Sequence, residues 1–112
     1  MSRKYESEQV EECVKYFRQN PVWNKVLKGF QKKYVSYGRF TGSVVVRNLT
    51  QEEIEELEGF FGKSFHRQKS VSISAEKFQK ALENSRYKNI KPDMILESYF
   101  GQPLLSRQEE GL

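Results

Sequence analysis

The sequence predicts an α+β domain in which about five helices pack around a small two-stranded sheet. Apolar residues recur at helical spacing in five stretches, and two short β-branched runs are bounded by glycine, asparagine or serine. With 112 residues, 37% apolar and 13% aromatic, the chain has enough apolar side chains for one core. We therefore expect a single domain over residues 1–105, followed by a tail or truncated linker over 106–112, where periodicity ends.

Two amphipathic helices open the chain. Residues 7–19 carry apolar side chains at i, i+3, i+4 and i+7, and Asn20-Pro21 ends this helix. Cys13 falls on its apolar face, which predicts a small buried side chain rather than a reactive thiol. Residues 21–37 predict a second helix, which Gly38 stops. Its long apolar stripe consists of Trp23, Val26, Leu27, Phe30, Tyr34 and Tyr37.

Two β-branched segments predict the strands of the sheet. In residues 42–47 the apolar run does not alternate with polar residues, which favours a central strand buried on both faces. Residues 70–74 alternate and predict the partner strand, with Val71 and Ile73 facing the core. The segment that joins them is long enough for a parallel crossover or for an antiparallel return, so the pairing direction stays open.

A helix between the two strands has readable ends. Thr50 and Glu53 stand at the spacing of a capping box, and Gly62 can close the helix with a positive φ. Its acidic residues spread over several positions of one exposed side, so a solvated surface is favoured over a cation site. These residues are Glu52, Glu55, Glu56 and Glu58.

Two further helices complete the predicted core. Ser74 caps a helix that ends near Asn84. Pro92 opens a fifth helix, which Gly101 closes. Four aromatic residues have no assured place in this core and are candidates for an interaction surface: Tyr5, Tyr16, Phe40 and Tyr87.

The net charge of +4 hides a strong segregation of charge along the chain. Residues 21–48 carry six basic side chains and no acidic one, and residues 63–91 carry eight basic side chains against two acidic ones. Glutamates dominate the segment between these blocks and also residues 6–12. One face of the protein is therefore expected to be basic and another acidic.

The basic blocks predict contact with nucleic acid phosphates, against the alternative of a merely solvated lysine face. Lys25, Lys28 and Lys32 lie one above the next on the second helix and span roughly 10 Å, comparable to several phosphate spacings. The loop 62–69 mixes cations, hydroxyl and amide donors with Phe65, which is either a contact or part of the core. The candidate DNA-binding residues are Lys25, Lys28, Lys32, Lys33, Arg39, Lys63, His66, Arg67 and Lys69.

Several classes of function are disfavoured by composition. Cys13 and His66 are the only cysteine and histidine, which leaves no intrachain disulfide, no zinc site made of Cys and His alone, and no predicted nucleophile–base pair. No phosphate-binding glycine loop is present, so we expect no cofactor and no enzymatic activity. No apolar run exceeds three residues and the first residues are polar, so we expect a cytoplasmic protein without a membrane span.

The order of several short motifs resembles a known family. These motifs are Gly42-Ser43-Val44-Val45-Val46-Arg47-Asn48-Leu49-Thr50-Gln51-Glu52-Glu53, Leu57, Phe61-Gly62, Val71-Ser72-Ile73, Phe78, Leu82, Ser85-Arg86-Tyr87, Leu96 and Phe100-Gly101-Gln102-Pro103-Leu104. Over residues 20–105 the chain resembles the N-terminal domain of the JetD-type nuclease subunit of type II Wadjet anti-plasmid systems.

This resemblance implies a role within a larger defence nuclease. Members of that family continue into a linker domain and a metal-dependent Toprim domain, whose carboxylate set is absent here because Asp93 is the only aspartate. The chain is then either a part of such a subunit or a stand-alone relative, and catalysis lies elsewhere. Two functions stay open: a non-specific DNA-contacting arm, or a module that docks on the condensin-like SMC complex or mediates a homodimer.

Overall fold

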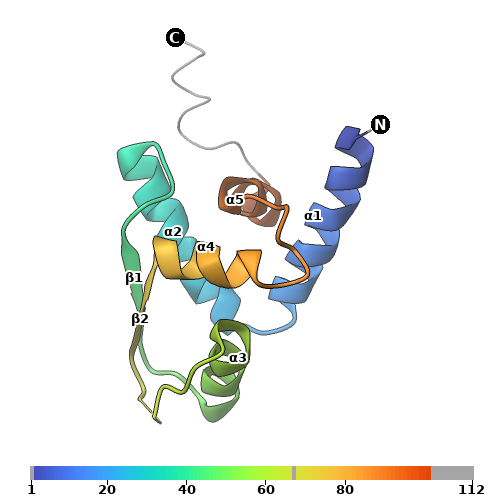
Figure 1. The fold of residues 1–112 in the computed structure, drawn as a ribbon. Coiled ribbons are helices and arrows are strands. Elements are labelled where there is room, and N and C mark those ends of the chain that lie inside the picture. Colours follow the sequence, from blue (N-terminus) through green and yellow to red (C-terminus); the bar gives the residue numbers. More distant parts are fainter. Residues whose placement is uncertain (1, 67, 102–112) are drawn as a thin grey trace.

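Five helices lie to one side of a two-stranded antiparallel sheet (Figure 1). The computed structural model describes residues 2–66 and 68–101, with side chains from residue 8 onward. The predicted α+β class is confirmed. In chain order the elements are α1 (Ser2–Arg18), α2 (Val22–Tyr37), β1 (Ser43–Val46), α3 (Gln51–Phe61), β2 (Val71–Ser74), α4 (Ala75–Glu83) and α5 (Pro92–Phe100). The predicted tail 106–112 lies outside the described residues.

The sheet covers one side of the core and leaves its other face open. β1 and β2 pair antiparallel, with Val44 opposite Ile73 and Val46 opposite Val71, and these four side chains are buried. The prediction that the first strand is central and buried on both faces is wrong, because Val45 is 53% exposed. A β-branched residue suits the pleated backbone on either face of a sheet. A run of valines without intervening polar residues therefore does not show that both faces of the strand are buried.

A glycine in α2 lets the helix lie unusually close to β1. A Cβ placed on Gly29 would stand 2.6 Å from one γ-carbon of Val44 and 3.0 Å from its β-carbon. Real side chains do not tolerate such a distance, so only glycine fits here. Glycine has a weaker helix propensity than alanine, but at this position it allows direct contact between α2 and the strand.

The first two helices follow the predicted pattern with two differences. α1 begins at Ser2 rather than at residue 7, and the sequence between these two positions contains no glycine or proline that would interrupt a helix. Cys13 is fully buried, as predicted, and burial raises the pKa of its thiol to about 12. The apolar stripe of α2 is buried except for Tyr37, which is 67% exposed because it lies on the last residue of the helix.

The local signals of α3 are confirmed in detail. The hydroxyl of Thr50 accepts a hydrogen bond from the backbone N–H of Glu53 at 3.2 Å, and Glu53 Oε1 accepts one from the N–H of Thr50 at 3.0 Å. This is the predicted capping box. Gly62 ends the helix at φ 68°.

The caps of α4 and α5 are also confirmed. Ser74 Oγ accepts from the N–H of Lys77 at 3.0 Å, and Gly101 closes α5 at φ 67°. α5 packs along α1, where the guanidinium of Arg18 donates to the backbone oxygen of Tyr99 at 2.8 Å.

An aromatic cluster joins the helices at the centre of the molecule. Phe78 of α4 lies between Phe17, Trp23 and Phe30, with ring centroids 5.6–6.3 Å from each. Three aromatic residues without an assured core position, Tyr16, Phe40 and Tyr87, are half-buried and pack against this core. Each ring therefore leaves only part of its area accessible, and their role as an interaction surface stays a prediction; the side chain of Tyr5 lies outside the described part.

Candidate nucleic-acid interface

The loop after α3 is held in place by one buried aromatic residue. Phe65 is 5% exposed, and its backbone N–H donates to Glu58 Oε2 at 2.9 Å. The backbone N–H of Gln68 donates a hydrogen bond to the backbone oxygen of Phe65 at 3.0 Å, which closes a turn. Of the two roles left open for Phe65, the structure therefore assigns it to the core.

The polar residues of this loop point outward around that anchor. Lys63, Ser64, His66 and Lys69 are exposed, and the N–H of His66 donates to Ser64 Oγ at 3.1 Å. His66 adopts a positive φ of 52°, an uncommon conformation for a residue with a Cβ. The ammonium of Lys63 lies 5.4 Å from the centroid of the Phe65 ring. Arg67, also predicted to bind DNA, lies outside the described residues.

Lys63 lies near Lys77 of α4. The nearby ammonium of Lys63, together with partial burial, holds the pKa of Lys77 below its ordinary value of 10.5. Lys80 is exposed one turn further along α4, and it lines a groove of about 290 Å³ together with Lys77 and one carboxylate, that of Glu76. No described carboxylate forms an ion pair with these three lysines. We call Lys63, Lys77 and Lys80 the basic cluster.

The lysine stripe of α2 is only partly available for binding. Lys25 Nζ lies 3.1 Å from Oε2 of Glu53, a residue that is 6% exposed, so Lys25 neutralises a buried carboxylate. Although Lys25 lies off the apolar stripe of α2, this ion pair ties it to the fold through α3. Lys28 and Lys32 are exposed and form no ion pair with a described carboxylate.

The other two candidates near α2 differ in exposure. The aliphatic stem of Lys33 is half-buried and passes over Gly42, where an added Cβ would lie 2.9 Å from Lys33 Cδ. Arg39 is exposed in the turn that leads to β1. Both residues belong to the α2 side of the molecule and not to the basic cluster.

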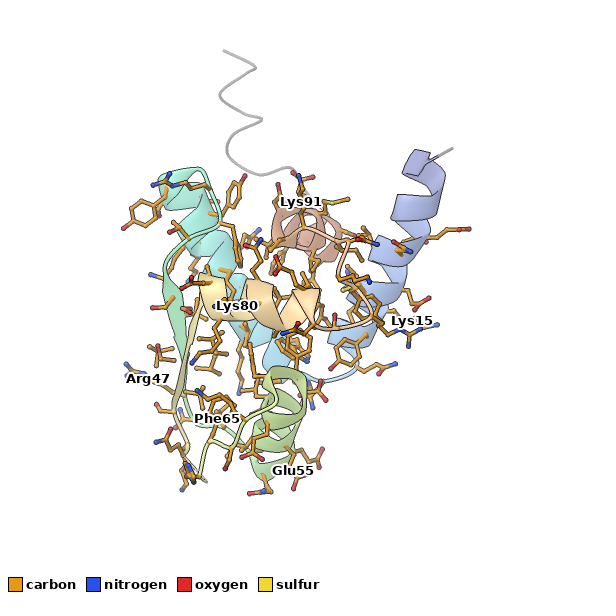
Figure 2. All side chains as sticks on the ribbon, in the orientation of Figure 1. Lys15, Arg47, Glu55, Phe65, Lys80 and Lys91 are labelled. Atoms are coloured by element: carbon orange, nitrogen blue, oxygen red, sulfur yellow. The ribbon has the colours of Figure 1, made fainter. Side chains whose placement is uncertain are left out.

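The structure does not bring the two predicted basic blocks onto one face. Phe30 of α2 packs on Phe78 of α4, so the exposed sides of these helices face away from each other. In Figure 1, α4 crosses in front of α2, and Figure 2 shows Lys80 on the near side. Lys28 and Lys32 therefore lie across the core from Lys80. Figure 2 also shows Arg47, Lys15 and Lys91 on three further sides of the molecule.

Sequence patterns placed Lys63, His66 and Lys69 in the candidate interface but missed Lys77 and Lys80. The sequence did contain a signal for Lys77 and Lys80. They are three residues apart on the predicted helix after Ser74, so they are neighbours on the same side of that helix. Only the fold shows that this side meets the loop after α3.

The acidic helix is less solvated than predicted. Glu52 and Glu55 are exposed, whereas Glu56 is half-buried and its Oε2 accepts hydrogen bonds from Trp23 Nε1, at 3.0 Å, and from the hydroxyl of Tyr16. Glu58 is also half-buried, and its carboxylate accepts the hydrogen bond from the backbone N–H of the loop after α3. Two of the four glutamates assigned to a free surface therefore hold other elements in place.

Within the described residues, no group of three or more His, Cys, Asp or Glu side chains is placed to hold a metal ion. The helices of that same part of the chain are too short or too polar to cross a membrane.

One family model matches the chain. Its description is "Protein of unknown function N-terminus (DUF3323)", and the match covers residues 40–111, from the turn before β1 through α5 and beyond. No match was found among curated proteins or among solved structures.

Proposed function

The chain belongs to this family, and we propose that it is the non-catalytic, DNA-contacting N-terminal domain of a plasmid-restricting nuclease subunit. The proposal is that it binds duplex DNA without sequence preference, through the basic cluster and the exposed cations of the neighbouring loop. One observation carries it: the ammonium of Lys63 lies near that of Lys77, and no described carboxylate is paired to either.

Phosphate binding is the chemistry that such a cluster favours. Two neighbouring ammonium groups repel each other, and a phosphate placed between them relieves this repulsion while releasing counterions from the DNA. Lys80 adds a third cation on the same helix, and Ser64 and His66 add polar groups from the anchored loop.

The surrounding protein is proposed from the family and from the motif resemblance. The description of the matched family refers to the N-terminus of a protein, which agrees with a domain that precedes others in a longer chain. We propose that a metal-dependent Toprim domain elsewhere in that protein cuts the DNA and that the subunit works in the cytoplasm. Its partners would then be plasmid DNA, the condensin-like SMC subunits and, through the parent protein, a second copy.

A salt titration with two matched variants tests the DNA interface. We expect the 112-residue chain to bind duplex DNA with a dissociation constant on the order of 1–100 μM and with steep salt dependence. The double variant Lys63→Gln/Lys80→Gln should lower the slope of log affinity against log salt by nearly one unit for each phosphate that is no longer neutralised.

The matched control is Lys28→Gln/Lys32→Gln, which removes the same charge from the other side of the core. If both variants reduce the slope equally, the protein attracts DNA through its net charge and has no defined interface. If the unmodified chain does not bind at low salt, DNA contact is refuted for this domain. Lys25 is left unchanged in both variants because its replacement would leave the Glu53 carboxylate buried and unpaired.

A further inference from the structure

A second groove, lined by aromatic rings and carboxylates, adjoins the groove of the basic cluster, and Ala81 and Asn84 line both. This second groove has a volume of about 450 Å³, within the range of ligand pockets, and opens between α1, α3 and the turn that follows α4. Tyr16, Phe60 and Tyr87 supply its rings, and Glu55 and Glu56 supply its carboxylates. Figure 2 shows Glu55 on α3, at the end of the molecule opposite to Lys91.

The walls of this groove are held by the core. The ring of Tyr16 lies 6.4 Å from that of Phe60 and 6.2 Å from that of Tyr87, centroid to centroid. Burial, and then the hydrogen bond to Glu56, raise the pKa of Tyr16 above its usual range, so its hydroxyl stays a donor at neutral pH. Trp23 donates to the same oxygen of Glu56, and the other carboxylate oxygen remains able to accept a bond from a ligand.

The charge around the groove is negative. Its one cation, Arg86, is paired with Glu12 at 2.8 Å, and Glu8 and Glu12 line a second hollow on the far side of Arg86 and Tyr87. A phosphate would meet these carboxylates at close range, which disfavours nucleic acid. The groove is complementary to a cation.

The chain itself contains the kind of contact that such a cation would make. The guanidinium of Arg86 lies 5.5 Å from the centroid of the Tyr87 ring while it pairs with a carboxylate, and that of Arg18 lies 4.7 Å from the ring of Tyr99. A planar guanidinium stacks on rings and donates two parallel hydrogen bonds, which a lysine ammonium does not.

From this combination we propose that the groove is a docking site for an arginine-containing basic segment of another protein. The arginine side chain lies against Tyr16 and Tyr87 and donates to the carboxylates of Glu55 and Glu56. This site adjoins the groove of the basic cluster, but it uses other charged side chains of the opposite sign, so neither proposal depends on the other.

Fluorescence anisotropy with short labelled peptides tests the site. The probes are an Arg/Ser peptide, a Lys/Ser peptide of the same length and charge, and a Glu/Ser peptide. We expect the arginine peptide to bind about three- to tenfold more tightly than the lysine peptide, and the acidic peptide not to bind. Equal affinity for the arginine and lysine peptides would overturn the site and leave only a diffuse negative surface.

Variants then locate the binding. Glu55→Gln/Glu56→Gln should weaken the arginine peptide about fivefold or more, whereas the equally charged control Glu52→Gln/Glu83→Gln, outside the groove, should change it less than about twofold. Tyr87→Leu should remove the preference for arginine over lysine. An equal loss in the groove and control variants would refute the assignment. If Glu56→Gln lowers the melting temperature, Glu55→Gln alone decides, because Glu55 is exposed.

Discussion

Glu53 connects the start of α3 to α2, and its replacement by alanine should destabilise the fold more than the replacement of the exposed Glu52 of the same helix. Its side chain is 8% exposed, accepts from the N–H of Thr50 at 3.0 Å and lies 3.1 Å from Nζ of Lys25 in α2. Although burial alone would raise the pKa of Glu53, its hydrogen bonds from Thr50 and Lys25 hold that pKa below the ordinary 4.5.

The expected loss for Glu53→Ala follows from these contacts. A hydrogen bond to a charged acceptor contributes about 1.5–3 kcal/mol, and the ion pair adds at most about 1 kcal/mol because the side chain of Lys25 is 43% exposed. We expect a loss of about 2–3 kcal/mol in the free energy of unfolding. For a domain of this size, that lowers the melting temperature by about 8–12 °C.

The assay is urea and thermal unfolding followed by circular dichroism, with Glu52→Ala as the control. Glu52 is exposed on the same helix, so its replacement should change stability by less than about 0.5 kcal/mol. Equal midpoints for the two variants would mean that the capping box and the ion pair contribute nothing in solution.

The pH dependence provides an independent check of the same group. The folded-state pKa of Glu53 is lowered, so its contribution is present above pH 4.5 and is lost as the pH falls below that value. Glu53→Gln should therefore flatten the stability profile in acid, and an unchanged profile would contradict this reasoning.

Three further predictions concern close packing, the buried thiol and catalysis. Gly29→Ala should destabilise the fold by about 1–2 kcal/mol, because the clash with Val44 outweighs the gain in helix propensity, whereas Gly59→Ala, with nothing within 4 Å, should be neutral or stabilising. If urea melts showed that Gly29→Ala stabilises the fold, or that both substitutions have the same effect, the close approach of α2 to β1 would be contradicted. The thiol of Cys13 should react with a disulfide reagent only upon unfolding, and rapid labelling of the folded chain would show that α1 opens. The purified chain should not nick plasmid DNA with magnesium or manganese; nicking that disappears on a single carboxylate substitution would refute its non-catalytic role.

Much of the candidate site depends on contacts that no sequence pattern contains. Spacing alone placed Lys63 and Lys69 in an exposed basic loop, and burial of Phe65 explains why that loop has a defined shape. Spacing did not indicate that Lys63 meets Lys77, or that the α2 lysines lie across the core from both. These relations arise from how helices pack, which is set by the whole core.

The helix ends that are capped by residues next to them in the chain could be predicted from the amino-acid sequence alone. The caps at Thr50 and Ser74 and the glycine stop at Gly62 act within four or five residues, so their geometry follows from local hydrogen bonds. Two other features emerge only in the folded chain: Val45 faces outward, and Lys25 pairs with Glu53. Both depend on which elements meet in space, because burial and ion pairing are properties of the assembled core and not of a residue and its neighbours in the chain.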